Sequence, residues 1–183
     1  MNSKRVIVYS CLGGLLLFLW QFISNAAMDF HEDFHVQTQH QDKILHLLDS
    51  LDLEEGSYMM PMYPKDFSSQ EIEAYMKNRA GKPWAIVQYH KNWKNDMLTP
   101  LLGGFLIDIL VAFFLIYVTS LIKDITLLKS VMVSLMFGLS GFFTINYLNF
   151  LWYETPDIWA WLLDGTIPWM GLGVFGFWVT SKN

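Results

Sequence analysis

The sequence predicts an all-α membrane protein, a four-helix transmembrane bundle with a small α+β extracytoplasmic insertion between the first and second helices. Of its 183 residues, 53% are hydrophobic and 16% are charged, whereas a soluble domain carries about 25% charged residues. The apolar residues gather in four stretches of about 20 residues, the length that crosses a bilayer as a helix. The net charge of −5 excludes the basic surface that nucleic-acid binding requires, so no nucleic-acid partner is expected.

The apolar stretches define the expected spans, and we divide the chain into residues 1–27, 28–96 and 97–183. The expected spans are Val6–Ala27, Leu98–Ile122, Ser130–Leu151 and Pro156–Thr180. In the fourth, Thr155 is the expected cap and Pro156 the first helical residue. Pro168 should kink this helix, because its ring clashes with the carbonyl group of Asp164.

The basic residues predict the orientation, since Lys and Arg concentrate in cytoplasmic loops. The segments that flank the spans on one side hold Lys4, Arg5, Lys123, Lys129 and Lys182. Residues 28–96 hold seven basic and twelve acidic residues and should be extracytoplasmic. We therefore expect a multi-pass protein of the bacterial cytoplasmic (inner) membrane, with both termini cytoplasmic. Residues 1–26 also resemble a signal peptide, but their long apolar run and Trp20 favour a retained anchor.

The insertion between the first two spans should contain two helices and a strand. Helical spacing over residues 36–53 is carried by Ile44, Leu45, Leu47, Leu48 and Leu51. Gly56 should end this helix, and residues 57–64 should be extended. Ser68 and Glu71 form a capping box that opens a helix, which ends at Gly81. Residues 83–90 should form a strand.

Polar side chains fall at similar depths in all four spans, in their outer halves. A rise of about 1.5 Å per residue places Asp108 roughly 15 Å and Asp164 roughly 12 Å from the outer helix ends. The other candidates for a pocket are Gln21, Asn25, Thr144, Asn146 and Asn149. An intramembrane carboxylate is costly and normally faces the bundle interior. No Lys, Arg or His lies in a span core to neutralise it, so a proton, water or a cation must do so.

Two interpretations of these polar residues stay open. They could form a hydrogen-bonded network that holds the helices together, or they could line a functional pocket. The tryptophans leave a similar choice. The outer-end group of Trp152, Trp159, Trp161 and Trp169 is typical of an aromatic belt but could also form a ligand-stacking wall.

The sequence does not predict a cofactor. All five histidines lie outside the spans, which argues against a haem held between helices. Gly171–Gly176 matches a dinucleotide motif but lies inside a span, so no nucleotide is expected. The densest ligand-like cluster contains Asp29, His31, Glu32 and His35. It could hold a metal ion, but solvated charge after a membrane span explains it better, and we expect no high-affinity metal site.

Four sequence motifs resemble an uncharacterised family of small four-span bacterial membrane proteins. They are residues 20–24 (WQFIS), 81–85 (GKPWA), 89–91 (YHK) and 149–156 (NFLWYETP). The resemblance covers nearly the whole chain. It implies a bacterial cytoplasmic-membrane protein and carries over no catalytic residue or activity.

We expect a non-enzymatic accessory or interaction module of the bacterial envelope, because no nucleophile and base are adjacent in sequence. Its partners would be the lipid bilayer and another membrane protein, and the sequence indicates no oligomeric state. The alternative is a protein that binds or transports a cation or small solute through the outer-half polar pocket. A metal-handling membrane enzyme is a third class.

Overall fold

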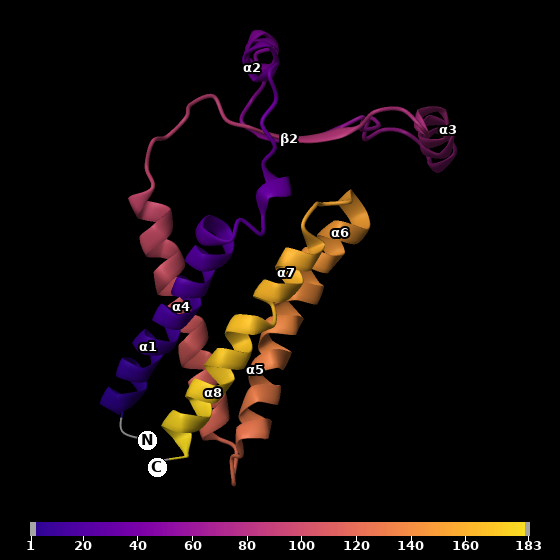
Figure 1. Cartoon of the computed structure of the whole chain (residues 1–183). Helices are drawn as coiled ribbons and strands as arrows, with labels where there is room; N and C mark the ends of the chain where they lie inside the picture. Colours follow the sequence, from indigo (N-terminus) through magenta and orange to yellow (C-terminus); the bar gives the residue numbers. More distant parts are fainter. Residues whose placement is uncertain (1–2, 182–183) are drawn as a thin grey trace. The chain divides into compact units, whose positions relative to one another are not determined.

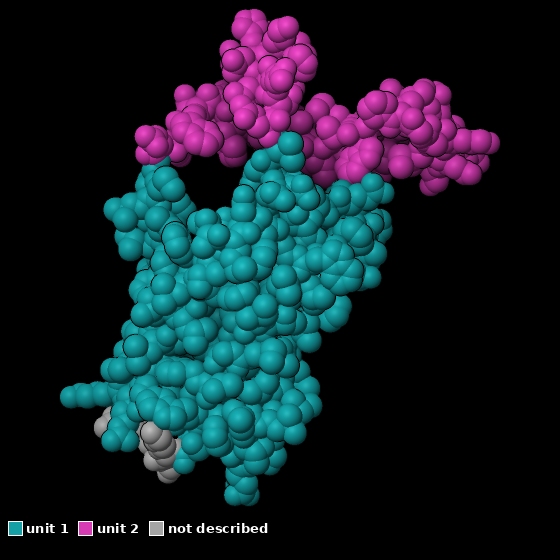
Figure 2. Space-filling model, in the orientation of Figure 1, with its two compact units in different colours: residues 1–36, 96–183 teal, residues 37–95 magenta. Residues whose placement is uncertain are grey.

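The computed structural model describes residues 3–181 and divides the chain into two compact units. One unit contains residues 1–36 and 96–183, and the other contains residues 37–95 (Figure 2). The first unit thus includes residues 28–36, which the sequence analysis assigned to the insertion.

Four helices of the first unit are long and apolar enough to cross a membrane, as predicted. They cover Lys4–Ala27, Leu98–Ser120, Leu127–Tyr153 and Ile158–Thr180 (Figure 1). The helix α1 (Ser3–Phe22) begins at the same end of the bundle at which α8 (Ile167–Thr180) ends. The helix α4 (Leu98–Ser120) is continuous and ends two residues before the expected Ile122.

Two of these long helices contain a π-helical turn. The first turn, η1 (Ile23–Ala27), extends α1 and is followed by the short 3-10 turn η2 (Glu32–Phe34). The second, η3 (Phe142–Tyr147), lies between α5 (Leu127–Gly141) and α6 (Leu148–Tyr153). Such turns insert one residue into the helical ladder and rotate the side chains that follow.

The fourth span differs from the expected single kinked helix. It consists of α7 (Ile158–Asp164) and α8, with a break at residues 165–166. Pro168 lies in the first turn of α8, where its missing N–H group costs no helical hydrogen bond. The expected start at Pro156 is wrong, because Glu154 and Asp157 adopt left-handed conformations, with φ of 49° and 64°, in the turn between α6 and α7.

The helices pack closely in two pairs, α1 with α4 and α5 with α8. A Cβ atom at Gly14 would lie 2.7 Å from the Ile109 backbone, so this glycine allows α1 and α4 to approach. Gly173 of α8 meets the Val131 backbone of α5 in the same way, also at 2.7 Å. By contrast, Gly103, Gly104 and Gly141 have open space where a Cβ would be placed.

The bundle interior also contains a small hydrophobic core and a buried hydrogen bond between helices. Leu17, Ala112, Leu115 and Leu172 form its hydrophobic core. The buried Ser130 hydroxyl donates to the Gly173 carbonyl group at 2.7 Å, which ties α5 to α8.

The second unit contains the helix α2 (Gln41–Ser50), the strands β1 (Gly56–Met60) and β2 (Ala85–Tyr89), and the helix α3 (Ser69–Arg79). The strands are antiparallel, and Gly56 pairs with Tyr89 at one end of the ladder. The capping box at α3 is present as predicted, and Gly81 follows it with φ of 77°. Gly56 begins β1 instead of ending α2, which is shorter than expected.

Candidate functional site

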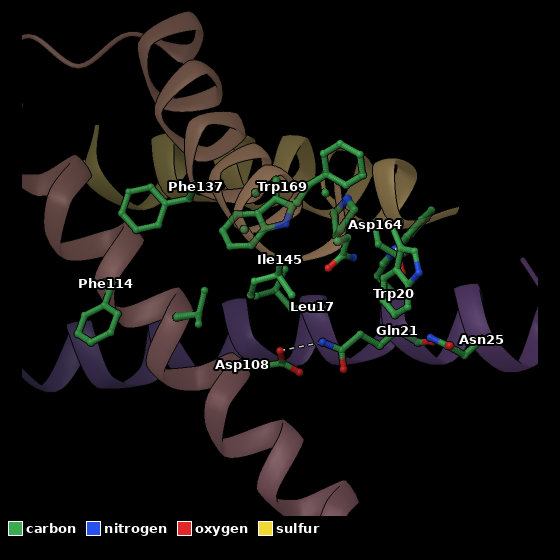
Figure 3. Close-up of a pocket in the computed structure, with 18 residues that line it drawn as sticks. Leu17, Trp20, Gln21, Asn25, Asp108, Phe114, Phe137, Ile145, Asp164 and Trp169 are labelled. Atoms are coloured by element: carbon green, nitrogen blue, oxygen red, sulfur yellow. Dashed lines mark hydrogen bonds between the residues drawn. The ribbon is translucent and has the colours of Figure 1, made fainter. Parts of the chain in front are cut away.

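A cavity of about 660 Å³ lies inside the first unit, between the α1–α4 pair and the group formed by α5, α7 and α8 (Figure 3). Its lining comes from every long helix of the unit. The lining residues are Leu17, Trp20, Gln21, Asn25, Asp108, Val111, Phe114, Phe137, Gly138, Gly141, Phe142, Ile145, Asn146, Trp161, Asp164, Gly165, Pro168 and Trp169.

Asp164 is the last residue of α7, and its carboxylate joins α7 to α1 through hydrogen bonds. Its Oδ1 accepts bonds from the Trp20 indole N–H at 2.8 Å and from the Ser24 hydroxyl at 2.7 Å. Its Oδ2 lies 2.9 Å from Nε2 of His31. Ser24 is fully buried and the His31 side chain is 7% exposed, whereas the Asp164 side chain is 19% exposed, so both of its oxygens have partners in a mostly buried setting.

His31 folds back from the chain after α1 and packs against α7. Its ring lies 4.4 Å from the Trp161 ring, measured between centroids. The Phe34 ring meets Trp161 edge-on at 5.9 Å. The Phe30 backbone N–H donates to the Ser24 carbonyl group at 3.0 Å, and Asp29 takes a left-handed φ of 51°, so the chain turns sharply here.

Behind His31 lies a second cavity of about 510 Å³ in the same unit. It is lined by Asn25, Asp29, His31, Glu32, Phe34, His35 and Trp161. Asn25 and Trp161 also line the first cavity, so these two side chains stand between the cavities.

Asp108 lies in the middle of α4 and has a different environment. Only 5% of the residue is exposed. Its Oδ1 accepts a hydrogen bond from the Gln21 side-chain amide at 2.9 Å, drawn as a dashed line in Figure 3. Its Oδ2 is buried and has no hydrogen-bond partner. A buried oxygen left unpaired is costly and is rare in native structures, so Asp108 has capacity for one further donor.

The π-helical turns help to place the polar side chains around the cavity. At η1 the Met28 N–H donates to the Ile23 carbonyl group, five residues earlier, at 2.9 Å. Asn25 of this turn donates from its side chain to the Gln21 carbonyl group at 3.0 Å. The turn η3 supplies Asn146 to the opposite wall. π-Helical turns of this kind often occur at functional sites.

The structure brings five of the seven predicted pocket residues into one cavity lining. These are Gln21, Asn25, Asp108, Asn146 and Asp164. Thr144 and Asn149 are exposed on the bundle surface and do not line the cavity. The Thr144 hydroxyl instead donates to the Ser140 carbonyl group of its own helix. Asp108 and Asp164 do not hydrogen-bond to each other within residues 3–181, since each has partners of its own.

Three partners of Asp164 were not predicted from the sequence, namely Trp20, Ser24 and His31. The sequence contains a pattern that could have indicated Trp20 and Ser24 as site residues. These two residues are one helical turn apart, as are the predicted pocket residues Gln21 and Asn25. Together they form a polar stripe on an otherwise apolar helix. The sequence prediction that a proton, water or a cation must neutralise the carboxylates did not consider His31, which follows the first span and contacts Asp164 because the sharp turn at Asp29 returns it to the bundle.

The four predicted metal-ligand candidates, Asp29, His31, Glu32 and His35, all line the second cavity. His31 is bonded to Asp164, whereas the His35 ring packs edge-on against Phe34 at 4.7 Å. Within residues 3–181, no three His, Cys, Asp or Glu side chains are grouped closely enough to hold a metal ion.

The four outer tryptophans separate into two kinds. Trp152 and Trp159 are 75% and 76% exposed, as expected for an aromatic belt. Trp161 and Trp169 line the cavity instead. The aromatic-belt interpretation therefore suits Trp152 and Trp159, and the ligand-stacking interpretation suits Trp161 and Trp169.

Comparison with known proteins finds no family model, no curated protein and no solved structure that matches the chain. The resemblance to a family of small four-span bacterial membrane proteins therefore stays a prediction.

Proposed function

We propose that the chain is a membrane-embedded binding protein that holds a small solute in the cavity between the α1–α4 pair and the α5–α7–α8 group. The observation that carries this proposal is the unpaired Oδ2 of Asp108, a buried acceptor on a residue of the cavity lining. The cavity volume of about 660 Å³ is in the range of sites for small molecules, about 300–1,000 Å³.

A purely structural network explains Asp164 better than it explains Asp108. Asp164 has three partners that tie α1 and the following turn to α7. Asp108 has one partner, Gln21, and would be a poor choice for a structural tie because half of its carboxylate is unpaired. A hydrogen-bond donor on a bound solute would satisfy the remaining oxygen.

The proposal places the cavity in the outer half of a cytoplasmic membrane, with both termini in the cytoplasm. The support is the distribution of Lys and Arg, which favours the cytoplasmic side for the end at which α1 begins and α8 ends. A solute would then reach the cavity from outside the cell or from the outer leaflet.

Native mass spectrometry of the protein purified from its membrane tests the binding function. We expect a small molecule bound at about one per chain. Gly141 lines the cavity and has open space at its Cβ position, so Gly141→Phe should fill the cavity and remove the added mass. Gly104→Phe is the matched control, because Gly104 also has open space but does not line the cavity. A bound molecule that survives Gly141→Phe would contradict the proposal.

An accessory role is the second candidate, and the apolar face of α2 favours it. Ile44, Leu47 and Leu51 follow helical spacing, yet each is 47–59% exposed. Within its own unit this face is not part of a core. We propose that it contacts another membrane protein.

Cross-linking in cells tests the accessory role. A partner captured by the full-length protein should be lost in the Leu47→Ser/Leu51→Ser variant and kept in Asp108→Asn. Equal capture by both variants would exclude α2 as the contact.

A further inference from the structure

The charge of the cavity lining indicates which class of solute fits. Among its residues, all within the described part of the chain, two are acidic and none is Lys, Arg or His. Both carboxylate oxygens of Asp164 already have hydrogen-bond partners, which are Trp20, Ser24 and His31. The unsatisfied negative group is therefore Asp108, whose Oδ2 has no partner and is enclosed by protein, so a ligand reaches it once neighbouring side chains move aside. A buried carboxylate of this kind is stabilised by a positive group brought into the cavity.

The rest of the lining is largely aromatic. Six rings contribute to it, those of Trp20, Phe114, Phe137, Phe142, Trp161 and Trp169. The labelled Phe137 and Trp169 lie on the wall opposite the α1 helix in Figure 3. Aromatic faces attract organic cations through their negative quadrupoles, and tryptophan does so most strongly. A ligand with a cationic head and an apolar or aromatic body would match both features of this lining.

A metal ion matches the same lining less well. Hard metal ions prefer about six oxygen ligands at short distance. Here the side-chain oxygens belong to two carboxylates with separate partners and to three amides, Gln21, Asn25 and Asn146. The volume of about 660 Å³ also far exceeds that of an ion.

We infer that the cavity binds a protonated organic amine, whose N–H donates to Oδ2 of Asp108 and whose apolar body packs among the aromatic rings. This inference rests on the proposed binding function and names its ligand class. Asp108 is the counter-ion, and Gln21 is a positioning residue that fixes the carboxylate through Oδ1. An N–H donor is required by the unpaired oxygen, so a quaternary ammonium, which lacks one, should bind more weakly.

The test measures binding of a panel of probes to the full-length protein in lipid nanodiscs by scintillation proximity. The panel contains three phenylalkylamines of increasing chain length, each with its neutral alcohol and its trimethylammonium analogue. For at least one amine we expect binding at least about 10-fold tighter than that of its alcohol, since a charge-assisted hydrogen bond is lost. Asp108→Asn should remove this difference, and Asp124→Asn, which changes an exposed acidic residue outside the cavity, should keep it.

The outcomes separate this inference from the binding function on which it depends. If amine and alcohol bind equally and Gly141→Phe blocks both, the cavity holds a solute but the amine class is wrong. If the trimethylammonium analogue binds as tightly as the amine, the N–H donor is not the recognised group. If no probe binds above the level of Gly141→Phe, the amine inference is overturned, and the binding function is decided by the native mass spectrometry of the purified protein.

Discussion

Asp164 and Asp108 line one cavity, but the hydrogen bonds of each carboxylate give them different roles. Asp164 accepts from Trp20 and Ser24 at Oδ1 and contacts His31 at Oδ2. Asp108 accepts from Gln21 alone. The first arrangement is that of a structural tie, and the second leaves an acceptor for a ligand. The two residues therefore predict different consequences of substitution.

Substitution of Asp164 should destabilise the bundle. In Asp164→Leu the Trp20 N–H, the Ser24 hydroxyl and the His31 ring lose their acceptor while they stay buried. The expected loss is about 3 kcal/mol of the free energy of unfolding, at the upper end for a buried partner left unsatisfied. Denaturant-induced unfolding in mixed micelles measures it. Asp164→Asn, which keeps the side-chain volume and an acceptor oxygen, is the control, and an equal effect of both variants would contradict the tie.

At the scale of elements, side chains that point into the cavity could be predicted from the sequence only where the helix is regular. Counting residues along the spans selected Asp108 and Asp164, and both line the cavity, although the count for Asp164 started from Pro156 and α7 begins at Ile158. The prediction that Thr144 lines the pocket is wrong because the π-helical turn at Phe142–Tyr147 changes the direction in which the side chains of the third span point. The amino-acid composition of the span does not indicate this turn. His31 was missed because its position depends on one left-handed residue, Asp29.

The segment of residues 28–36 should depend on His31 for its attachment to α7. His31→Ala removes the bond to Asp164 and the packing on Trp161. We expect faster amide hydrogen exchange over residues 29–35 and unchanged exchange in α5. His35→Ala, which loses only the contact with Phe34, is the matched control. Equal exchange in wild type and His31→Ala would show that the segment is held by other contacts.

The helix α3 should lose stability in acid through its capping box. Hydrogen bonds from the Ser68 hydroxyl and backbone N–H lower the pKa of Glu71 from its ordinary value of 4.5. A lowered folded-state pKa stabilises the helix above about pH 4.5, and this stabilisation is lost as the pH falls through the lower, folded-state value. Amide exchange in residues 69–79, corrected for intrinsic rates, should show this loss. Ser68→Ala lacks the box and should show a weaker pH dependence, so an identical profile would contradict the assignment.

At the scale of the whole molecule, the proposed topology places residues 37–95 outside the cell. A cysteine at Ser69, introduced as Ser69→Cys in a Cys11→Ser background, should react with an impermeant thiol reagent in intact spheroplasts. Asp124→Cys, in the link between α4 and α5, should react only after lysis. The reverse pattern would invert the topology and place the cavity in the cytoplasmic half of the membrane.

Ligand-dependent thermal unfolding of the wild type and Asp108→Asn tests the central claim most directly. The claim is that Asp108 serves a bound amine and not the fold. Without ligand the two proteins should be equally stable within about 1 kcal/mol, because Asn keeps an acceptor for Gln21. An amine at 100 times its Kd should stabilise the wild type by about 2.7 kcal/mol and Asp108→Asn far less. Equal stabilisation of both, or a large loss of stability in Asp108→Asn without ligand, would contradict the account.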